Sequence, residues 1–387
     1  MGHDAHSHRT RPGRTHLLTV VMAGVVGISG VACAATPAAP SVPSAPATPT
    51  HTRTTWDRLR GTELEDGFPT AVTATAADEV WVFHGSRSQA GSSSWLVLWD
   101  GREWRRESLP DALRSAPVLA VSDADGRVWA LAHTVKEGAS AIHHDGASWR
   151  MSEIDPTWEP TALAPVGDGG AWMLGRTSSF DTYAAHFDGH AWNPRPAPTV
   201  TSGLDSSEDG EVFAVGDRSG ELTVERWDGS GWAPEEIPEV DIPGGEPGAS
   251  FNDVLVRASD DVWAVGNISW KDPDEHNHQR PVLAHYDGTE WTIEVGDEEG
   301  SYEAVADDGR GGLYLVDGHW NTVMEHRTAD EERTRQELVA TDHDIVFHGL
   351  ASVPDGAGAI LATVAMDKGD PDEPTSHGRV YGTGSWY

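Results

Sequence analysis

One short motif recurs along most of the chain, and this repetition limits the fold more than any other feature. The motif is a small or acidic turn followed by an aliphatic run around an aromatic residue, as in DEVWVFHG (78–85) and DDVWAVGN (260–267). A weaker copy, GAILATV (358–364), continues the series. The spacings between the first six aromatic positions are 48, 43, 41, 50 and 51 residues, at Trp81, Trp129, Trp172, Phe213, Trp263 and Tyr314. A period of this length indicates a repeat architecture.

A second motif, Asp-Gly-x-x-Trp, follows the first in five of the repeats. Its copies are WDGREW (99–104), HDGASW (144–149), FDGHAW (187–192), WDGSGW (227–232) and YDGTEW (286–291). Asp-Gly is a strong hairpin signal because glycine readily adopts a positive φ. The flanking aromatic residues should then face each other across two antiparallel strands. Each repeat therefore consists of four short strands, which is the layout of a propeller blade.

The length of the repetitive part sets the number of blades. Residues 56–387 amount to about 47 residues for each of seven units, close to the observed period. We predict an all-β fold: a seven-bladed β-propeller of four-stranded antiparallel blades over 56–387. Residues 56–59 resemble the outer strand of the other repeats. We expect them to pair with the last blade near residues 376–386, which would remove an open sheet edge.

The first 32 residues have the pattern of a signal peptide. Three arginines (Arg9, Arg11 and Arg14) precede the apolar stretch LLTVVMAGVVGISGVA (17–32), and the only cysteine, Cys33, follows at once. Residues 30–33 (GVAC) resemble the lipobox of bacterial lipoproteins, which usually has leucine where this chain has Gly30. The resemblance implies lipid attachment at Cys33; ordinary signal cleavage is the alternative.

Residues 33–55 are mostly Ala, Pro, Ser and Thr without periodicity. Such a segment buries too little apolar surface to fold, so we predict a semi-extended tether. We expect the propeller to be held at the extracellular face of the cytoplasmic membrane, or to be released. Its only membrane contact would be the N-terminal lipid anchor, and we expect a monomer.

The recurrent V-W-A-V-G and D-G-x-x-W motifs resemble those of secreted and lipoprotein β-propellers of actinobacteria. The resemblance covers residues 56–387. It implies a fold and a surface location, but because the motifs are structural it implies no reaction.

The charge of the chain limits the classes of partner that it can bind. There are 27 Lys plus Arg against 62 Asp plus Glu, a net charge of −35, which disfavours binding to nucleic-acid phosphates. G-x-S-x-G, H-E-x-x-H and P-loop motifs are absent from the sequence, so we assign no catalytic residue. We predict a non-catalytic ligand-binding or interaction scaffold, with a glycan or an envelope protein as partner. The alternative is an extracellular glycan-active hydrolase or lyase, with Glu159 and Glu303 as the acid/base pair.

The ligand-binding candidates lie where the innermost strands begin, because these positions should ring the mouth of the central channel. Aromatic rings, carboxylates, an amide and an imidazole suit a polar ligand with a stackable face, such as a sugar. The alternative is that these side chains only fill and solvate the end of the channel. The candidates are Trp158, Glu159, Phe251, Asn252, Tyr302, Glu303 and His348, with Trp320 from a neighbouring loop.

The tetrapeptide Asp-Pro-Asp-Glu occurs twice, nine residues after Trp263 and nine residues after Leu361. The two loops should therefore occupy equivalent places on one face of the ring. Clustered carboxylates suit Ca²⁺, the one cofactor that we expect if any binds, whereas histidines suit a softer metal. The alternative is that Asp-Pro only nucleates a turn. The metal-ligand candidates are Asp272, Asp274, Glu275, His276, His278, Asp370, Asp372 and Glu373.

Overall fold

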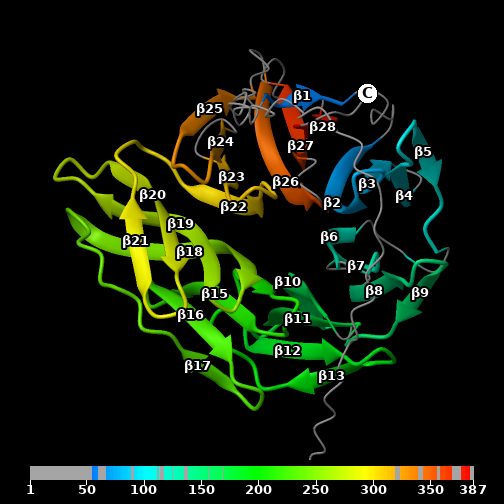
Figure 1. Cartoon of the computed structure of the whole chain (residues 1–387), viewed down its shortest axis with the longest axis horizontal. Coiled ribbons are helices and arrows are strands. Elements are labelled where there is room, and N and C mark those ends of the chain that lie inside the picture. Colours follow the sequence, from blue (N-terminus) through cyan, green and yellow to red (C-terminus); the bar gives the residue numbers. More distant parts are fainter. Residues whose placement is uncertain are drawn as a thin grey trace, which may run out of the picture. The chain divides into compact units, whose positions relative to one another are not determined.

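Seven four-stranded antiparallel sheets form a ring in the computed structural model, so the predicted seven-bladed β-propeller is confirmed (Figure 1). The structure describes residues 55–59, 67–88, 91–110, 113, 117–123, 125–134, 138–155, 157–167, 169–318, 323–338, 343–354, 358–367 and 376–383. These residues contain no α-helix. Accordingly, no helix in this part of the chain has the length and apolar character to cross a membrane.

In each of the first six blades, four consecutive strands run from the ring axis outward. Blade one comprises β2 (Phe68–Ala76), β3 (Glu79–Ser88), β4 (Gly91–Trp99) and β5 (Trp104–Glu107). Blade two comprises β6 (Pro117–Ser122), β7 (Val128–Thr134), β8 (Gly138–His144) and β9 (Trp149–Ser152). Blade three comprises β10 (Trp158–Val166), β11 (Gly170–Thr177), β12 (Thr182–Phe187) and β13 (Trp192–Arg195).

The next three blades follow the same order. Blade four comprises β14 (Gly203–Ser206), β15 (Val212–Arg218), β16 (Glu221–Trp227) and β17 (Trp232–Pro234). Blade five comprises β18 (Gly245–Ala258), β19 (Asp261–Lys271), β20 (Asn277–Tyr286) and β21 (Trp291–Val295). Blade six comprises β22 (Tyr302–Asp307), β23 (Leu313–Asp317), β24 (Val323–Arg327) and β25 (Arg333–Glu337).

Blade seven is built from both ends of the folded chain. Its inner strands are β26 (His343–Val353), β27 (Gly358–Asp367) and β28 (Ser376–Gly382), and its outer strand is β1 (Asp57–Arg58). Asp57 lies opposite Gly382 and Arg58 opposite Tyr381, which confirms the predicted pairing of residues 56–59 with the last blade. The flanking Trp56 and Leu59 are buried, so this closure is held by side-chain packing as well as by main-chain hydrogen bonds.

The Asp-Gly-x-x-Trp motif forms the turn between the third and fourth strands of a blade. In blade five, Tyr286 lies opposite Trp291, and Gly288 has a φ of 91°. Asp287 accepts hydrogen bonds from the hydroxyl of Thr289 and from the N–H groups of Thr289 and Glu290. These bonds lower the pKa of Asp287 to about 2 and fix the turn. The same register occurs in blades one to four.

The glycine that ends the V-W-A-V-G motif has a steric role. Gly266 lies opposite Phe251, where the innermost strand of blade five leaves regular register. A Cβ on Gly266 would lie 2.0 Å from the carbonyl oxygen of Ser250. In blade three, Gly175 lies opposite Pro160, and a Cβ on Gly175 would lie 2.3 Å from the carbonyl oxygen of Glu159. A side chain at either glycine would push the irregular innermost strand away.

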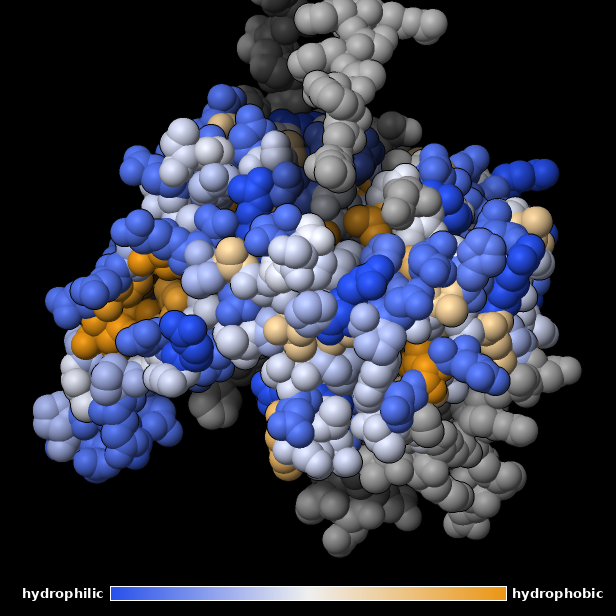
Figure 2. Space-filling view, turned by 90° about the horizontal axis from the view of Figure 1, so that it is seen from below, coloured by the Kyte–Doolittle hydropathy of each residue, from blue (hydrophilic) through white to orange (hydrophobic). Residues whose placement is uncertain are grey.

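The repeated aromatic residues pack between blades. The ring of Trp172 in blade three lies 4.8 Å from Trp227 and 5.7 Å from Trp232, both in blade four. Trp81 makes the corresponding edge contact with Trp149 of blade two at 5.6 Å. On the face drawn in Figure 2, hydrophilic residues predominate and apolar residues show in separate areas.

Candidate functional site

A cavity of about 420 Å³ lies along the axis of the ring. Each of the seven innermost strands contributes to its wall: β2, β6, β10, β14, β18, β22 and β26. Its volume falls within the range of ~300–1,000 Å³ that is usual for small-molecule pockets. The central channel is therefore the first candidate site.

A β-bulge near the start of the innermost strand supplies one wall residue in each of five blades. At the bulge the register with the second strand skips a residue, and the skipped residue lies in the cavity wall. Bulges often redirect a side chain toward a functional site. The skipped wall residues are Val118, Thr161, Asn252, Glu303 and His348.

These bulge residues divide the mouth into a polar and a less polar part. In blade two the residue is Val118, with 41% of its surface exposed, and in blade three it is Thr161, whose hydroxyl donates to the carbonyl oxygen of Thr201. In blades five, six and seven it is Asn252, Glu303 and His348, respectively, and we call these three residues the polar sector. A ligand at the mouth would meet an amide, a carboxylate and an imidazole on one side only.

The surroundings of the polar sector constrain two of its side chains and lower the pKa of the third. The Nδ2 atom of Asn252 donates a hydrogen bond of 2.9 Å to the carbonyl oxygen of Tyr302 in the next blade. The Glu303 side chain occupies space that a Cβ on Gly318 would fill, at 2.4 Å. Burial lowers the pKa of His348, which favours the neutral imidazole near pH 7.

Two further carboxylates of the channel wall are half-buried: Asp205 and Asp253. Asp205 accepts a hydrogen bond from the N–H of Val256 at 2.7 Å, and Asp253 accepts one from the N–H of Val305 at 3.0 Å. Burial raises the pKa of Asp205 to about 7 and that of Asp253 to about 6. Each carboxylate therefore connects two blades and titrates near neutral pH.

Sequence reasoning missed both of these aspartates. Each occupies an innermost strand beside an apolar neighbour, Leu204 or Val254. For Asp253, a carboxylate beside the apolar run 254–256 was the available signal, because a buried ionisable group is unusual without a partner. Asp205 is followed by Ser206 and Ser207, so its sequence offered no such signal.

Phe251 and Tyr302 are buried between blades and are not among the residues that line the cavity. Phe251 is fully buried in the core that blades four and five share. The hydroxyl of Tyr302 donates to Oε2 of Glu325 at 3.2 Å, and burial raises its pKa. The structure gives no support to the prediction that Phe251 and Tyr302 contact a ligand.

Trp158 and Glu159 begin the innermost strand of blade three but do not line the cavity. Trp158 stacks on Tyr183 with ring centroids 4.2 Å apart. Glu159 is exposed. Of the proposed acid/base pair, only Glu303 thus contributes to the channel wall.

The predicted blade-five metal loop is the hairpin turn between β19 and β20. Oδ1 of Asp272 accepts hydrogen bonds from the N–H groups of Asp274 and His276, each at 2.9 Å. These and further hydrogen bonds lower the pKa of Asp272 to about 2, the N–H of His276 having the largest effect. Ligand atoms of Asp272, Asp274 and His276 come within 4.8 Å of one another, so these three could hold a divalent cation. Metal binding here stays a prediction.

His278 and Glu275 of the same hairpin have other partners. Nδ1 of His278 lies 2.5 Å from Oε1 of Glu299, and its Nε2 lies 3.3 Å from Oδ2 of Asp272. Glu299 and then Asp272 raise the pKa of His278. Glu275 forms an ion pair with Lys271 at 3.7 Å. His278 therefore fastens the hairpin to the segment that follows β21.

The remaining predicted residues lie outside the part of the chain that the structure describes. These are the loop residues Trp320, Asp370, Asp372 and Glu373 and the lipidation candidate Cys33. The second Asp-Pro-Asp-Glu segment falls between β27 and β28, the connection equivalent to β19–β20 in blade five.

No protein-family model matches the chain, and no curated protein matches its sequence. Among solved structures, the chain is similar to YCF48 bound to D1 peptide, with a TM-score of 0.51 and 16% identity over 88% of this chain and 99% of that one. It is also similar to the polysaccharide lyase Uly1, with a TM-score of 0.52 and 10% identity over 83% of this chain and 90% of that one. At these identities the similarity shows the fold alone.

Proposed function

We propose that this protein is a lipid-anchored propeller of the cell surface that binds a ligand at the channel mouth without transforming it. The observation that supports the proposal is the one-sided polar sector, Asn252, Glu303 and His348, at the opening of a cavity of about 420 Å³. Such a wall can bind hydroxyl or amide groups of a glycan or of an envelope protein.

The arrangement of carboxylates favours binding over hydrolysis. Glycoside hydrolysis uses two carboxyl groups that both face the scissile bond, ~5–10 Å apart. Glu303 faces the cavity, whereas its predicted partner Glu159 is exposed and outside the cavity wall. The other two wall carboxylates, Asp205 and Asp253, already accept main-chain hydrogen bonds that join the blades.

The surface location rests on the sequence. Cys33 is the only cysteine and directly follows the apolar signal segment. Cys33→Ser should move the protein from the membrane fraction to the medium, and mass spectrometry of the N-terminal peptide should find a lipid on the wild-type chain only.

Binding can be tested with the secreted Cys33→Ser chain on a glycan array, beside a pull-down from envelope extract. We expect Glu303→Gln and His348→Ala to weaken retention of the bound glycan or protein at least tenfold. Glu290→Gln, an exposed change in a third-to-fourth strand turn, is the matched control. Release of sugar products from a retained glycan would instead support the enzyme alternative. Equal retention by all variants would place the binding site outside the channel.

A further inference from the structure

The axial cavity of about 420 Å³ has carboxylates from three consecutive blades in its wall. Asp205 comes from blade four, Asp253 from blade five and Glu303 from blade six. With His348 they are the titratable side chains of the described wall, which contains no lysine or arginine. Burial lowers the pKa of His348, so its imidazole adds little positive charge near pH 7. The charge of the cavity wall is therefore negative.

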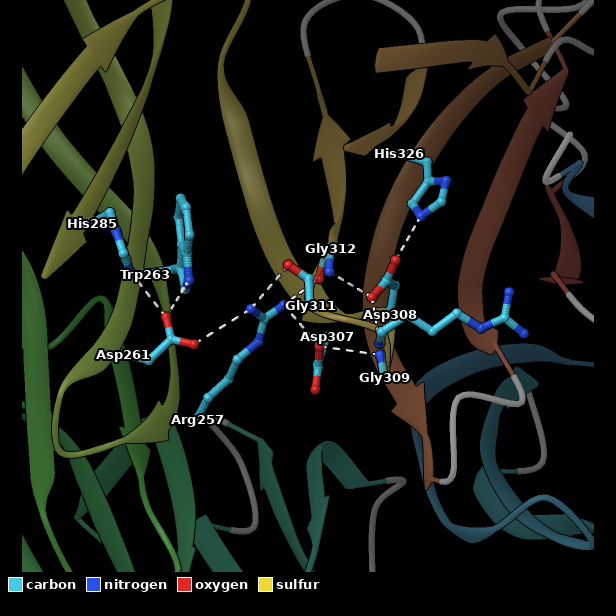
Figure 3. Close-up of polar contacts among 11 residues, drawn as sticks. Arg257, Asp261, Trp263, His285, Asp307, Asp308, Gly309, Gly311, Gly312 and His326 are labelled. Carbon is cyan, nitrogen blue, oxygen red and sulfur yellow. Dashed lines mark hydrogen bonds and ion pairs between the residues drawn. The ribbon is translucent and has the colours of Figure 1, made fainter. Parts of the chain in front are cut away.

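Carboxylates elsewhere in blades five and six have basic partners (Figure 3). Oδ1 of Asp307 lies 2.8 Å from the guanidinium of Arg257, and Oδ2 of Asp308 lies 2.9 Å from Nε2 of His326. Burial by itself would raise the pKa of Asp308, but His326 and two main-chain N–H groups lower it. Donors near this carboxylate thus compensate for its burial.

The channel aspartates have no such basic partner in the described part of the chain. Burial raises the pKa of Asp205 to about 7 and that of Asp253 to about 6, and only main-chain N–H groups oppose this effect. The charge of Asp253 raises the pKa of Asp205 further. A partly buried charge is unfavourable without an opposite charge beside it. A positively charged ligand would supply that opposite charge.

The spread of the carboxylates favours a molecular cation over a metal ion. A metal ion needs several ligand atoms in one coordination sphere. In the described residues, the metal-ligating side chains that converge within 4.8 Å are Asp272, Asp274 and His276 of the blade-five hairpin. The channel carboxylates do not form such a group.

The carboxylates are also staggered along the channel. Glu303 occupies a bulge near the mouth. Asp253 lies opposite Val265, two residues after the repeated aromatic residue of its blade, whereas Asp205 lies opposite the repeated aromatic residue Phe213 itself. Asp205 is therefore two residues further from the mouth, ~7 Å along a strand. A ligand that enters from the mouth meets negative charge at successive depths.

Much of the remaining wall is aliphatic. Half-buried members of it are Leu119, Val121, Leu255 and Leu350. An alkylammonium group suits this combination, because its methylene stem packs on apolar surface while its charged end pairs with a carboxylate. A sugar hydroxyl or a peptide amide would leave the charges of the wall uncompensated.

We infer that the channel binds an alkylammonium group, carried either by a free aliphatic amine or by a lysine side chain of a protein. The inference rests on the proposed function, since it concerns the same channel, and it names the chemistry of the group that enters. The carboxylates of blades four to six would bind the ammonium, and the aliphatic wall would bind the methylene stem.

The test uses the secreted Cys33→Ser chain at pH 8, where Asp205 and Asp253 are largely ionised and alkylamines keep their proton. Titration calorimetry compares two amines with uncharged analogues of the same length. Pentane-1,5-diamine is compared with pentane-1,5-diol, and Nα-acetyl-lysine methylamide with Nα-acetyl-norleucine methylamide. At least one amine should bind at least tenfold more tightly than its analogue. Binding of the diamine alone would assign a free amine, and binding of the lysine derivative alone a protein side chain.

The variants Glu303→Gln and Asp205→Asn should each weaken amine binding at least fivefold. Each removes one charge of the channel wall and keeps a hydrogen-bond acceptor. Glu290→Gln, an exposed change outside the cavity wall, is the matched control for the loss of one negative charge and should bind as the parent does. Urea unfolding verifies that each variant is folded.

Equal binding of each amine and its uncharged analogue would overturn the inference. Undiminished amine binding to Glu303→Gln and to folded Asp205→Asn would also overturn it, as would the absence of binding by both amines. If the parent chain still retains a glycan or an envelope protein in that last case, the proposed function stands without the inference. Amine binding by a chain that retains neither partner would support the inference and contradict the proposed partners.

Discussion

The carboxylate of Asp205 in blade four accepts a 2.7 Å hydrogen bond from the main-chain N–H of Val256 in blade five. Asp253 repeats this relationship one blade further on, with the N–H of Val305 at 3.0 Å. A side chain of one blade thus binds the main chain of the next, close to the ring axis. Since burial raises both pKa values, the charge at these junctions depends on pH.

Asp205→Asn should make the protein more stable at alkaline pH. The pKa of Asp205 is about 7 in the folded chain and near 3.8 when unfolded, so folding favours its protonated form. The stability that protonated Asp205 contributes to the fold is fully present below pH 3.8 and is lost as the pH rises through about 7. Asparagine keeps the acceptor for Val256 without the charge. Because the side chain is half-buried, we expect a gain on the order of 1–2 kcal/mol at pH 8.

Urea unfolding at pH 5 and pH 8 measures this effect, with Asp241→Asn as an exposed control. The gain should be larger at pH 8 than at pH 5. Equal destabilisation by Asp205→Asn at both pH values would contradict a raised pKa.

Trp56→Ala should destabilise the whole ring. Trp56 is 4% exposed and packs edge-on against Tyr314 of blade six at 5.5 Å. The main-chain N–H of Trp56, which alanine keeps, donates to Oε1 of Gln336 at 2.7 Å. Removing a buried indole costs about 3–5 kcal/mol. Urea unfolding should show this loss, whereas Asp57→Ala, an exposed change in β1, should cost less than about 1 kcal/mol.

The imidazole of His278 should titrate above its usual pKa of 6.5. Glu299 and Asp272 both raise this pKa. The stability that His278 contributes by joining the β19–β20 hairpin to the segment after β21 is therefore fully present below pH 6.5. It is lost as the pH rises through the raised pKa of His278. NMR titration of the His278 ring gives the pKa directly. Glu299→Gln should lower it, and Glu298→Gln, whose carboxylate contacts Arg335 instead, should leave it nearly unchanged.

Two turn glycines with the same φ should differ in their tolerance of alanine. Gly229 has a φ of 92° and open space at its Cβ position, so Gly229→Ala should cost only backbone strain, about 1 kcal/mol. Gly288 has a φ of 91°, but a Cβ there would lie 2.7 Å from Cβ of Asp260. Gly288→Ala should therefore cost ~1–3 kcal/mol more, measured by urea unfolding. Equal losses would show that the turn moves freely away from Asp260.

The sequence by itself determined the architecture of the ring. Each blade is a series of hairpins between neighbouring strands, and its turns depend on local chemistry such as that of Asp287 and Gly288. The period of the repeated aromatic residues then gives the number of blades, and the strand-like segment at residues 56–59 gives the closure. Apart from the closure, these features need no knowledge of distant contacts, because hairpins are local in the sequence.

The tertiary structure decided which side chains face the channel and which are buried between blades. Successive strand residues point to opposite faces, and a bulge changes that alternation, so Asn252 lines the channel while Phe251 beside it is buried between blades. The half-burial of Asp205 and its hydrogen bond to Val256 arise only when neighbouring blades come together. The physical reason is that both depend on surfaces brought together from separate repeats, which no single repeat encodes.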